Sequence, residues 1–285
     1  MKFLKNQCSL LGFRAGIKVS FTALLILSFS FTGCIQKSKS KQANNEWHIF
    51  ILMGQSNMAG YGELLPEDTI PVDGIFHIPT VCEGEYVWKN SAHPLHNRLK
   101  SDRFGLGLPF AKAYLEKHLG VNVALIPVAW GGAGIDRLKK GTDIYNDAFA
   151  KAKFAQKKGK IKGILWHQGE SDTVTEELAE GYEGKLHQLI ADLRTDLNTP
   201  ALPFIVGNLA EFYGTNEEHN APARVNRINQ VKSVLRSLPG KVENTGFVES
   251  TGCTSIDHHN VHFDRNSYIL LGNRYEEKYE EIVHK

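Results

Sequence analysis

Cysteine is scarce in this sequence, which holds four in 285 residues. Cys8 and Cys34 belong to an N-terminal segment with the features of an export signal, so Cys82 and Cys253 are the only pair left in the remainder. In an oxidising compartment these two can form a single disulfide. Their spacing does not decide between that bond and two separate buried thiols.

Acidic residues are absent from the first 33 positions, which hold four basic ones: Lys2, Lys5, Arg14 and Lys18. The apolar run from Val19 to Phe31 that follows is shorter than the ~20 residues of a comfortable membrane-spanning helix. A basic start followed by a short apolar run is typical of a secretory signal. We therefore expect residues 1–33 to be a signal peptide, with an uncleaved N-terminal anchor as the alternative.

The segment ends in Phe31-Thr32-Gly33-Cys34, which resembles the lipobox of bacterial lipoproteins, although Phe31 replaces the usual leucine. The resemblance implies that cleavage before Cys34 leaves this cysteine as a lipidated N-terminus. The protein would then be exported and anchored to a bacterial membrane, on a periplasmic or cell-surface face. Residues 34–45 are polar and lysine-rich, which predicts a flexible tether. A plain signal peptide with a chance cysteine is the alternative.

An excess of positive charge is also absent once the signal is discounted. Removing its four basic residues leaves 33 − 4 = 29 basic against 31 acidic residues, a net charge near −2 instead of +2. This balance gives no indication of a nucleic-acid-binding surface. The chain also lacks internal repeats and low-complexity tracts, so residues 46–285 are expected to form one domain.

Apolar, β-rich runs alternate with amphipathic stretches along this domain. The predicted strands are 48–53, 121–129, 161–166, 203–207 and 242–248, and the predicted helices are 105–118, 142–157, 175–197, 221–238 and one after Asp264. This alternation predicts a three-layer α/β/α sandwich around a parallel sheet of about five strands. Residues 61–104 show little periodicity, and we expect them to form a long functional loop whose Tyr86 and Trp88 help to line a substrate site. Packing of these two aromatics within the loop itself is the alternative.

One serine stands where a strand meets a turn, in Gly54-Gln55-Ser56-Asn57-Met58. Gly54 permits a tight turn after the buried strand, which places the Ser56 hydroxyl at the carboxyl edge of the sheet. Open α/β folds bind their ligands at that edge. Alone, the serine is equally consistent with a helix N-cap.

Other turns that follow predicted strands also carry reactive or small residues. Parallel strands end at one edge, so Ser56, Gly131, Gly132, Gln168, Glu170 and His262 can converge there although they are far apart in sequence. A serine becomes a nucleophile when an imidazole accepts its proton and an acid orients that imidazole. His262 is the candidate base, while a metal site built on His259, His262 and Cys253 or Asp257 lacks a recognisable ligand spacing.

Acyl transfer through a serine also requires donors for the oxyanion. The backbone amides of Ser56 and of Gly131 or Gly132 suit this role, and Gln168 offers a side-chain amide. The stretch Gly131-Gly132-Ala133-Gly134 is otherwise a plain turn or a weak phosphate cradle, since it lacks the Lys-Ser/Thr ending of a P-loop.

Four blocks together resemble the SGNH-type hydrolases. They are Gly54-Gln55-Ser56-Asn57-Met58, Trp130-Gly131-Gly132, Trp166-His167-Gln168-Gly169-Glu170-Ser171-Asp172 and Val261-His262-Phe263. The sequence is more closely similar to the branch of carbohydrate esterase family six acetylxylan esterases and sialate O-acetylesterases. The resemblance implies a flavodoxin-like fold, Ser56 as nucleophile, His262 as base, and an oxyanion hole from Ser56, the 131–132 glycines and Gln168.

The acid of the triad is open between two carboxylates. Many SGNH hydrolases carry an aspartate three residues before the histidine, but His259 occupies that position here. In the xylan-acetyl branch the glutamate of the third block orients the base, which implies Glu170, with Asp257 as the alternative acid. Glu170 could also serve only as a carboxylate at a helix start.

We therefore expect a serine esterase that removes O-acetyl groups from an acetylated oligo- or polysaccharide of acetylxylan type, without a metal or cofactor. We also expect Asn57, Tyr86, Trp88 and Trp130 to contact the sugar. O-acetylated sialic acid is the rival substrate, and an arginine near Ser56, from among Arg103, Arg137 and Arg224, would favour it. A glycan-binding lipoprotein without turnover is the alternative from another class.

Overall fold

The computed structural model describes residues 46–82, 84–256 and 259–285. Its strands are β1 (Glu46–Gly54), β2 (Val72–His77), β3 (Lys89–Ser91), β4 (Val121–Pro127), β5 (Lys160–His167), β6 (Phe204–Gly207) and β7 (Thr245–Val248). Its α-helices are α1 (Ser56–Ala59), α2 (Gly107–Lys117), α3 (Asp143–Ala155), α4 (Glu176–Asp196), α5 (Pro222–Ser237) and α6 (Arg265–Val283). Short 3-10 turns are η1 (Pro66–Thr69), η2 (Ile135–Arg137), η3 (Glu170–Thr173) and η4 (Leu238–Gly240). The predicted signal, tether and lipidated Cys34, and the alternative acid Asp257, lie outside the described residues.

The strands form one seven-stranded sheet in the order β3-β2-β4-β1-β5-β6-β7. β3 pairs antiparallel with β2, and every other neighbouring pair is parallel. The five predicted strands are present, and among themselves they follow the order 2-1-3-4-5 of flavodoxin-like folds. In such a sheet the strand order reverses at the first strand, so the crevice beyond the end of β1 is the expected place for a ligand.

Two strands were not predicted, and both come from the stretch 61–104 that was expected to be a loop. β2 and β3 lie at the edge of the sheet, and only Ile75 of β2 is fully buried. β2 also contains Gly74 at φ +77°, and β3 has three residues. Short edge strands with so little buried surface leave no alternating pattern in the sequence.

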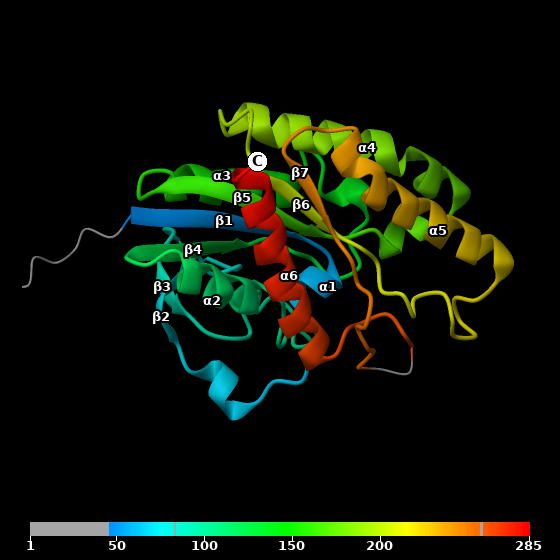
Figure 1. The fold of residues 1–285 in the computed structure, drawn as a ribbon, viewed down its shortest axis with the longest axis horizontal. Coiled ribbons are helices and arrows are strands. Elements are labelled where there is room, and N and C mark those ends of the chain that lie inside the picture. Colours follow the sequence, from blue (N-terminus) through cyan, green and yellow to red (C-terminus); the bar gives the residue numbers. More distant parts are fainter. Residues whose placement is uncertain (1–45, 83, 257–258) are drawn as a thin grey trace, which may run out of the picture. The chain divides into compact units, whose positions relative to one another are not determined.

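Helices cover both faces of the sheet, which confirms the three-layer architecture. α2 and α6 pack against one another on one face, and α3, α4 and α5 lie on the other (Figure 1). Ile49 to Met53 of β1 have no solvent exposure, because this central strand is covered from both sides. The Phe50 ring contacts Phe110 and Tyr114 of α2 and Tyr279 of α6, with centroids 4.8 to 5.3 Å away.

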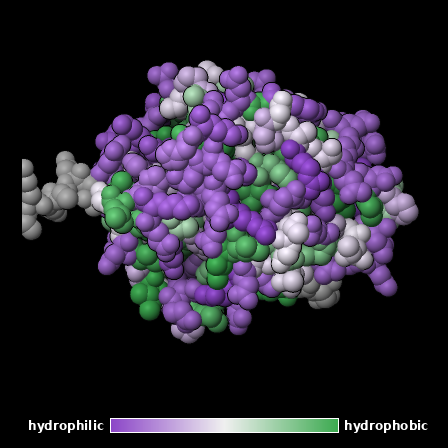
Figure 2. Space-filling model, viewed as in Figure 1, coloured by the Kyte–Doolittle hydropathy of each residue, from purple (hydrophilic) through white to green (hydrophobic). Residues whose placement is uncertain are grey.

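The surface drawn in Figure 2 is mostly hydrophilic, with its apolar residues in scattered groups. Among the described residues, none of the helices has the length and hydropathy needed to cross a bilayer. Cys82 and Cys253 are both free thiols, so of the two alternatives left open for this pair the structure has the separate thiols.

Candidate active site

The turn between β1 and α1 fixes the position of Ser56. Gly54 has φ +153°, and a Cβ there would lie 2.2 Å from the carbonyl oxygen of His167, so only glycine fits against β5. The Gln55 amide donates to that same carbonyl at 3.0 Å. α1 begins at Ser56 itself, and the residue at the N-cap position is Gln55. Ser56 is therefore not the helix N-cap that its sequence context allowed.

A cavity of about 320 Å³ opens beyond the carboxyl end of β1. Its wall is formed by Gln55, Ser56, Tyr61, Gly132, Glu170, Ser171, Val174, Tyr213, His219, Arg224, Val261 and His262. Ser56, Gly132, Glu170 and His262 follow four different strands and line this one space. The predicted convergence of these strand ends is thus observed for these four residues.

The imidazole of His262 is held by an aromatic neighbour that the sequence analysis did not select. The ring of Tyr61 is stacked on it, with centroids 3.9 Å apart and planes 13° apart. The Tyr61 hydroxyl lies 3.0 Å from Ser101 Oγ, and the Tyr61 amide donates to the Tyr268 hydroxyl at 3.3 Å. These contacts anchor the stacked ring in the wall of the cavity.

Asn57 connects the segments that carry Ser56, Glu170 and His262. Its Nδ2 donates to Glu170 Oε1 at 2.6 Å and to the Val261 carbonyl at 2.9 Å. Its Oδ1 accepts from the Phe263 amide at 3.3 Å and from the Tyr268 hydroxyl at 2.9 Å. The side chain has no solvent exposure and its hydrogen-bonding capacity is filled. The prediction that Asn57 binds the sugar is wrong, because these internal partners occupy it.

Glu170 lies in the cavity wall with its carboxylate almost fully buried. Oε1 accepts the bond from Asn57, while Oε2 has no hydrogen-bond partner within the described residues. Burial raises the pKa of Glu170, and the Asn57 bond opposes part of that rise by stabilising the charged form. The side chain therefore faces the site, rather than serving only as a carboxylate at the start of η3.

Gln168 does not reach the cavity. Its Nε2 lies within 3.1 Å of three internal acceptors, Gln55 Oε1, the Ala133 carbonyl and Asp172 Oδ2. With no exposed surface and only two N–H groups, this amide has no donor left for a substrate oxygen. The predicted role of Gln168 in the oxyanion hole is corrected to a structural one.

Asp172 extends this buried network to the glycine turn. Its two carboxylate oxygens accept the Ile135 amide at 3.3 and 3.0 Å, which ties the end of the Gly131–Gly134 stretch to the third sequence block. Burial raises the pKa of Asp172, and the bond from Gln168 opposes that rise. Of the two glycines predicted for the oxyanion hole, Gly132 lines the cavity at φ +72°. Gly131 is its exposed neighbour, and a Cβ on it would lie 3.3 Å from Leu99 Cδ1 and 3.5 Å from the Tyr61 hydroxyl.

Tyr86 and Trp88 lie at the opposite end of the sheet. Trp88 packs against Trp47, at the start of β1, and both Trp88 and Tyr86 pack against Phe154 at the end of α3. Seven residues of extended strand, roughly 23 Å, separate Trp47 from the end of β1. The prediction that these aromatics contact the substrate is therefore wrong. The ring partners found are Trp47 of β1 and Phe154 of α3, outside the loop, so the alternative of packing within the loop itself does not describe these contacts either. Trp130 follows β4 near the site, with the Arg98 guanidinium carbon 3.1 Å above its ring centre.

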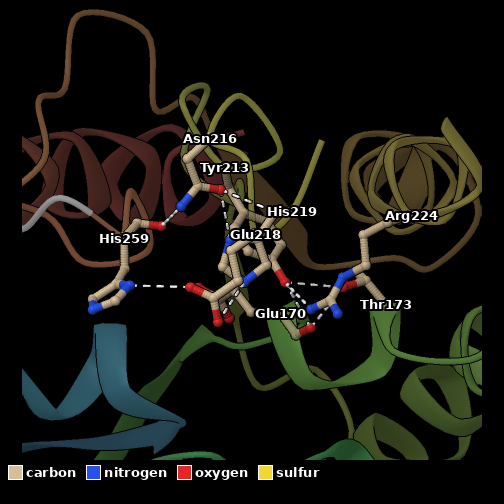
Figure 3. Close-up of polar contacts among 8 residues, drawn as sticks. All are labelled: Glu170, Thr173, Tyr213, Asn216, Glu218, His219, Arg224 and His259. Atoms are coloured by element: carbon tan, nitrogen blue, oxygen red, sulfur yellow. Dashed lines mark hydrogen bonds and ion pairs between the residues drawn. The ribbon is translucent and has the colours of Figure 1, made fainter. Parts of the chain in front are cut away.

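Three wall residues follow β6. They are Tyr213, His219 and Arg224, and Figure 3 shows them beside Glu170. Tyr213 and His219 were not predicted, whereas Arg224 is one of the three arginines named as candidates for a place near Ser56. Arg224 Nη2 donates to the Tyr213 hydroxyl at 2.8 Å, and that hydroxyl lies 3.2 Å from the Glu170 carbonyl. Burial and the nearby Arg224 charge lower the pKa of His219. Because β6 ends at the same edge as β1, the rule that located Ser56 also pointed to this segment.

The same segment contacts the loop before His262. Glu218 Oε2 lies 3.0 Å from His259 Nδ1, and Asn216 Nδ2 donates to the His259 carbonyl (Figure 3). Arg103 and Arg137 are not among the residues that line the cavity. Within the described residues, no three His, Cys, Asp or Glu side chains form a cluster that could hold a metal ion.

Comparisons with known proteins place this arrangement in a family. Residues 46–281 match the family model described as carbohydrate esterase, sialic acid-specific acetylesterase. The chain is 30% identical over 245 residues to a probable carbohydrate esterase of Arabidopsis thaliana, covering 79% of this chain and 86% of that protein. The X-ray structure of an Arabidopsis thaliana protein superposes with a TM-score of 0.70 at 28% identity, over 82% of this chain and 98% of that one. A carbohydrate acetylesterase from Xanthomonas citri shares the fold at 18% identity and a TM-score of 0.62, over 83% of this chain and 56% of that one.

The family match spans nearly all of the described residues, including every residue that lines the cavity around Ser56. The carbohydrate esterases cleave carboxylic esters, and the flavodoxin-like α/β fold expected from the sequence is the fold observed. This chain belongs to the carbohydrate esterase family of sialic acid-specific acetylesterases and is a carbohydrate acetylesterase.

Proposed function

We propose that the protein hydrolyses O-acetyl esters of a carbohydrate through a serine acyl-enzyme, with Ser56 as nucleophile and His262 as base. The observation that carries the proposal is the shared cavity, in which Ser56, His262 and Gly132 line one solvent-accessible space. A nucleophile, a proton acceptor and a glycine amide in one cavity are the parts that acyl transfer requires.

The reaction proceeds in two steps. Ser56 Oγ attacks the acetyl carbonyl while His262 takes the hydroxyl proton, and the backbone amides of Ser56 and Gly132 stabilise the oxyanion. Collapse breaks the ester bond, His262 donates its proton to the leaving sugar oxygen, and the acetyl group stays on Ser56. Water then attacks the acyl carbon while His262 takes a proton from it, the bond to Ser56 Oγ breaks, acetate leaves, and His262 returns the proton to Ser56 Oγ.

Two carboxylates compete for the third role in the triad. Glu170 is supported by its place in the cavity wall and by the Asn57 bridge to Val261, the neighbour of His262. Asp257 is the sequence alternative. Glu170→Gln and Asp257→Asn remove one negative charge each with little change in shape. The variant that loses kcat by orders of magnitude identifies the acid, because an unsupported imidazole is a poor base.

Release of acetate from 4-nitrophenyl acetate tests the core of the mechanism. Ser56→Ala should reduce turnover to background, and Ser171→Ala, which alters another serine of the same cavity wall, should retain it. Retained turnover in Ser56→Ala would rule out the serine mechanism. A wild-type protein that binds glycan without releasing acetate would favour the non-catalytic alternative.

Acetylated xylan and O-acetylated sialic acid are the two substrate candidates, and Arg224 favours the second. Sialic acid carries a carboxylate, which a guanidinium binds well. Arg224 lines the cavity with Ser56, and its Nε is buried without a hydrogen-bond partner among the described residues. Arg224→Gln should raise KM for O-acetylated sialic acid by about tenfold or more, the value of a hydrogen bond to a charged group, and leave KM for acetylated xylan nearly unchanged. Equal changes on both substrates would favour the xylan assignment.

A further inference from the structure

A second cavity of about 310 Å³ lies on the same edge of the sheet as the active site. Thr80, Val81 and Cys82, which follow β2, form one wall, and Asp143 and Asp147 of α3 form another. Arg98 and Trp130 complete it. A space of this size is at the lower end of the range for small-molecule sites.

The two cavities are neighbours through one short stretch of backbone. Trp130 lines the second cavity and Gly132 lines the first, so their Cα atoms are at most about 7.6 Å apart, two steps of 3.8 Å. Between them, Gly131 is exposed, and a Cβ on it would lie 3.5 Å from the hydroxyl of Tyr61, which belongs to the wall of the first cavity. A molecule that occupies the first cavity is therefore close enough to extend into the second.

Thr80 points to a ligand in the second cavity. Its residue is 6% exposed, and its Oγ1 is buried without a hydrogen-bond partner among the described residues. A buried hydroxyl left unpaired costs free energy, so such a group calls for a partner. A hydroxyl of a bound molecule would supply one.

The wall that carries Thr80 is held firmly in place. Lys151 of α3 has no solvent exposure, and its Nζ donates to the Thr80 carbonyl at 2.8 Å and to Asp147 Oδ2 at 2.7 Å. This buried cation joins the strand-end wall to the helix wall. Preorganised walls reduce the entropy that a ligand must overcome on binding.

The chemistry of the lining selects the class of ligand. Arg98 provides N–H donors, Asp143 and Asp147 provide acceptors, and Thr80 can act as either. The Trp130 ring is covered by the Arg98 guanidinium, whose carbon lies 3.1 Å from the ring centre. Two carboxylates beside one guanidinium disfavour an anion, whereas the mixture of donors and acceptors suits the hydroxyls of a sugar. The lining is therefore matched to a neutral polyol.

We propose that this cavity binds a second, neutral sugar residue of the oligosaccharide whose acetyl group is cleaved at Ser56. The proposal rests on the proposed esterase function and deepens it, because it makes the substrate an acetylated oligosaccharide instead of a free monosaccharide. The residues that bind the second sugar then contribute to recognition of the oligosaccharide that leaves as the alcohol product.

The variant Thr80→Val tests the proposal, and Thr199→Val is its matched control. Thr199 Oγ1 is likewise buried without a partner among the described residues, and Thr199 also lines a cavity, but that cavity lies at the amino end of the sheet with Lys160 and Leu202, away from Ser56. The probes are an acetylated xylo-oligosaccharide and 4-nitrophenyl acetate, which has no second sugar. Thr80→Val should lower the ratio of kcat/KM on the oligosaccharide to kcat/KM on the small ester by about 3- to 10-fold, the value of one neutral hydrogen bond. Thr199→Val should leave the ratio at its wild-type value.

Thermal unfolding distinguishes a loss of oligosaccharide binding from a loss of stability. Neither threonine hydroxyl has a partner to lose within the described part of the chain, so both valine variants should have a Tm equal to or above that of the wild type. An oligosaccharide-specific loss in Thr80→Val without a fall in Tm supports the subsite. An unchanged ratio, or the same change in Thr199→Val, would overturn it.

Direct binding separates the subsite from the esterase mechanism. The deacetylated xylo-oligosaccharide is titrated into Ser56→Ala with and without Thr80→Val, and calorimetry gives Kd without turnover. A Kd that rises 3- to 10-fold with Thr80→Val supports the subsite, and equal affinities or no binding to either protein overturn it. Failure of the proposed esterase function would instead be seen as unchanged acetate release by Ser56→Ala.

Discussion

The rings of Tyr61 and His262 are stacked with centroids 3.9 Å apart, although the residues lie on the first and last strand-end segments of the domain. The Tyr61 ring covers one face of the imidazole and restricts its rotation. A general base must keep its nitrogen aimed at the proton that it accepts. The stacking partner is thus a positioning residue for the base.

Tyr61→Ala should lower kcat by about 2- to 10-fold, the value of one aromatic ring pair, because His262 gains rotational freedom. Tyr61→Phe keeps the ring and removes only the hydroxyl near Ser101, so it should retain most of the activity. Steady-state kinetics on 4-nitrophenyl acetate measures both. Equal losses in the two variants would show that the hydroxyl matters and the stacking does not.

Asn57 should prove essential for the alignment of the site. Asn57→Ala leaves Glu170 Oε1, the Val261 carbonyl and the Phe263 amide without their shared partner. Each unpaired buried group costs about 1–3 kcal/mol, so we expect a substantial loss of the free energy of unfolding and a fall in kcat with KM nearly constant. Urea unfolding and steady-state kinetics measure these two effects.

Asn208→Ala is the control for that experiment. Asn208 is also buried and donates to a glutamate, Glu249, at 3.2 Å, but it does not line the cavity. The control should lose stability without a comparable loss of kcat. If kcat falls equally in both variants, the effect of Asn57 is general destabilisation and not alignment.

The proposed role of the Gly132 amide as an oxyanion donor can be tested by a substitution that introduces no steric clash. It has φ +72°, and a Cβ would meet no atom within 4 Å, so Gly132→Ala strains the backbone and fills no occupied space. The left-handed conformation costs an alanine about 1–2 kcal/mol, and we expect this loss of stability. Displacement of an oxyanion donor should also lower kcat by more than tenfold.

Gly141→Ala is a matched substitution outside the cavity. Gly141 has φ +91° and equally open surroundings, so it should lose the same stability and keep its kcat. Thermal melts and acetate release compare the pair. A normal kcat in Gly132→Ala would exclude this amide from the oxyanion hole.

The ends of the buried strands could be predicted because each apolar run stops at a block of glycine and polar residues, and parallel strands place these blocks at the same edge of the sheet. β1, β4 and β5 are apolar runs that stop at glycine-containing blocks, and parallel pairing brings those stops together at one edge. Ser56, Gly132 and Glu170 could therefore be placed in one site before any coordinates were known. The bounds of the five predicted strands also required only small adjustment.

Side-chain partners could not be predicted in the same way. Gln168 stands in the third sequence block, yet its direction depends on Gln55, Ala133 and Asp172, which compete for its two N–H groups. A sequence motif specifies a position along the chain and not which acceptor the amide reaches. The same reason applies to Asn57, whose four bonds come from segments more than 100 residues away.

The prediction that residues 61–104 form one long functional loop was wrong because this stretch contains two strands at the edge of the sheet. β2 is parallel to β4 and carries the chain toward the carboxyl edge, whereas β3 is antiparallel and runs back. Tyr86 and Trp88, which precede β3, pack against Phe154 and Trp47 instead of near Ser56. Arg98, in contrast, follows β3 and reaches Trp130. Within residues 61–104, closeness to Ser56 in the sequence therefore does not predict closeness to Ser56 in the fold.

Buried histidines should make the domain sensitive to acid. His93 and His96 are 6% and 1% exposed, and burial lowers the pKa of each from 6.5 to about 3. In the unfolded chain these side chains take up protons near pH 6.5, whereas the folded protein keeps them neutral until pH ~3. The stability due to neutral histidine is thus complete above pH ~6.5 and is lost as pH falls from about 6.5 to about 3.

His96→Gln isolates this effect, because glutamine does not titrate. Each such histidine adds a slope of about 1.4 kcal/mol per pH unit to the free energy of unfolding in that window. Urea unfolding between pH 4 and 6.5 should therefore show that the free energy of unfolding falls less steeply with decreasing pH in His96→Gln than in the wild type. The difference in slope should be about 1.4 kcal/mol per pH unit, the contribution of one proton. Carboxylates with raised pKa, such as Glu170 and Asp172, are common to both proteins and cancel in the difference. Parallel pH profiles would mean that His96 already carries its proton in the folded state, or that the unfolded chain does not take it up.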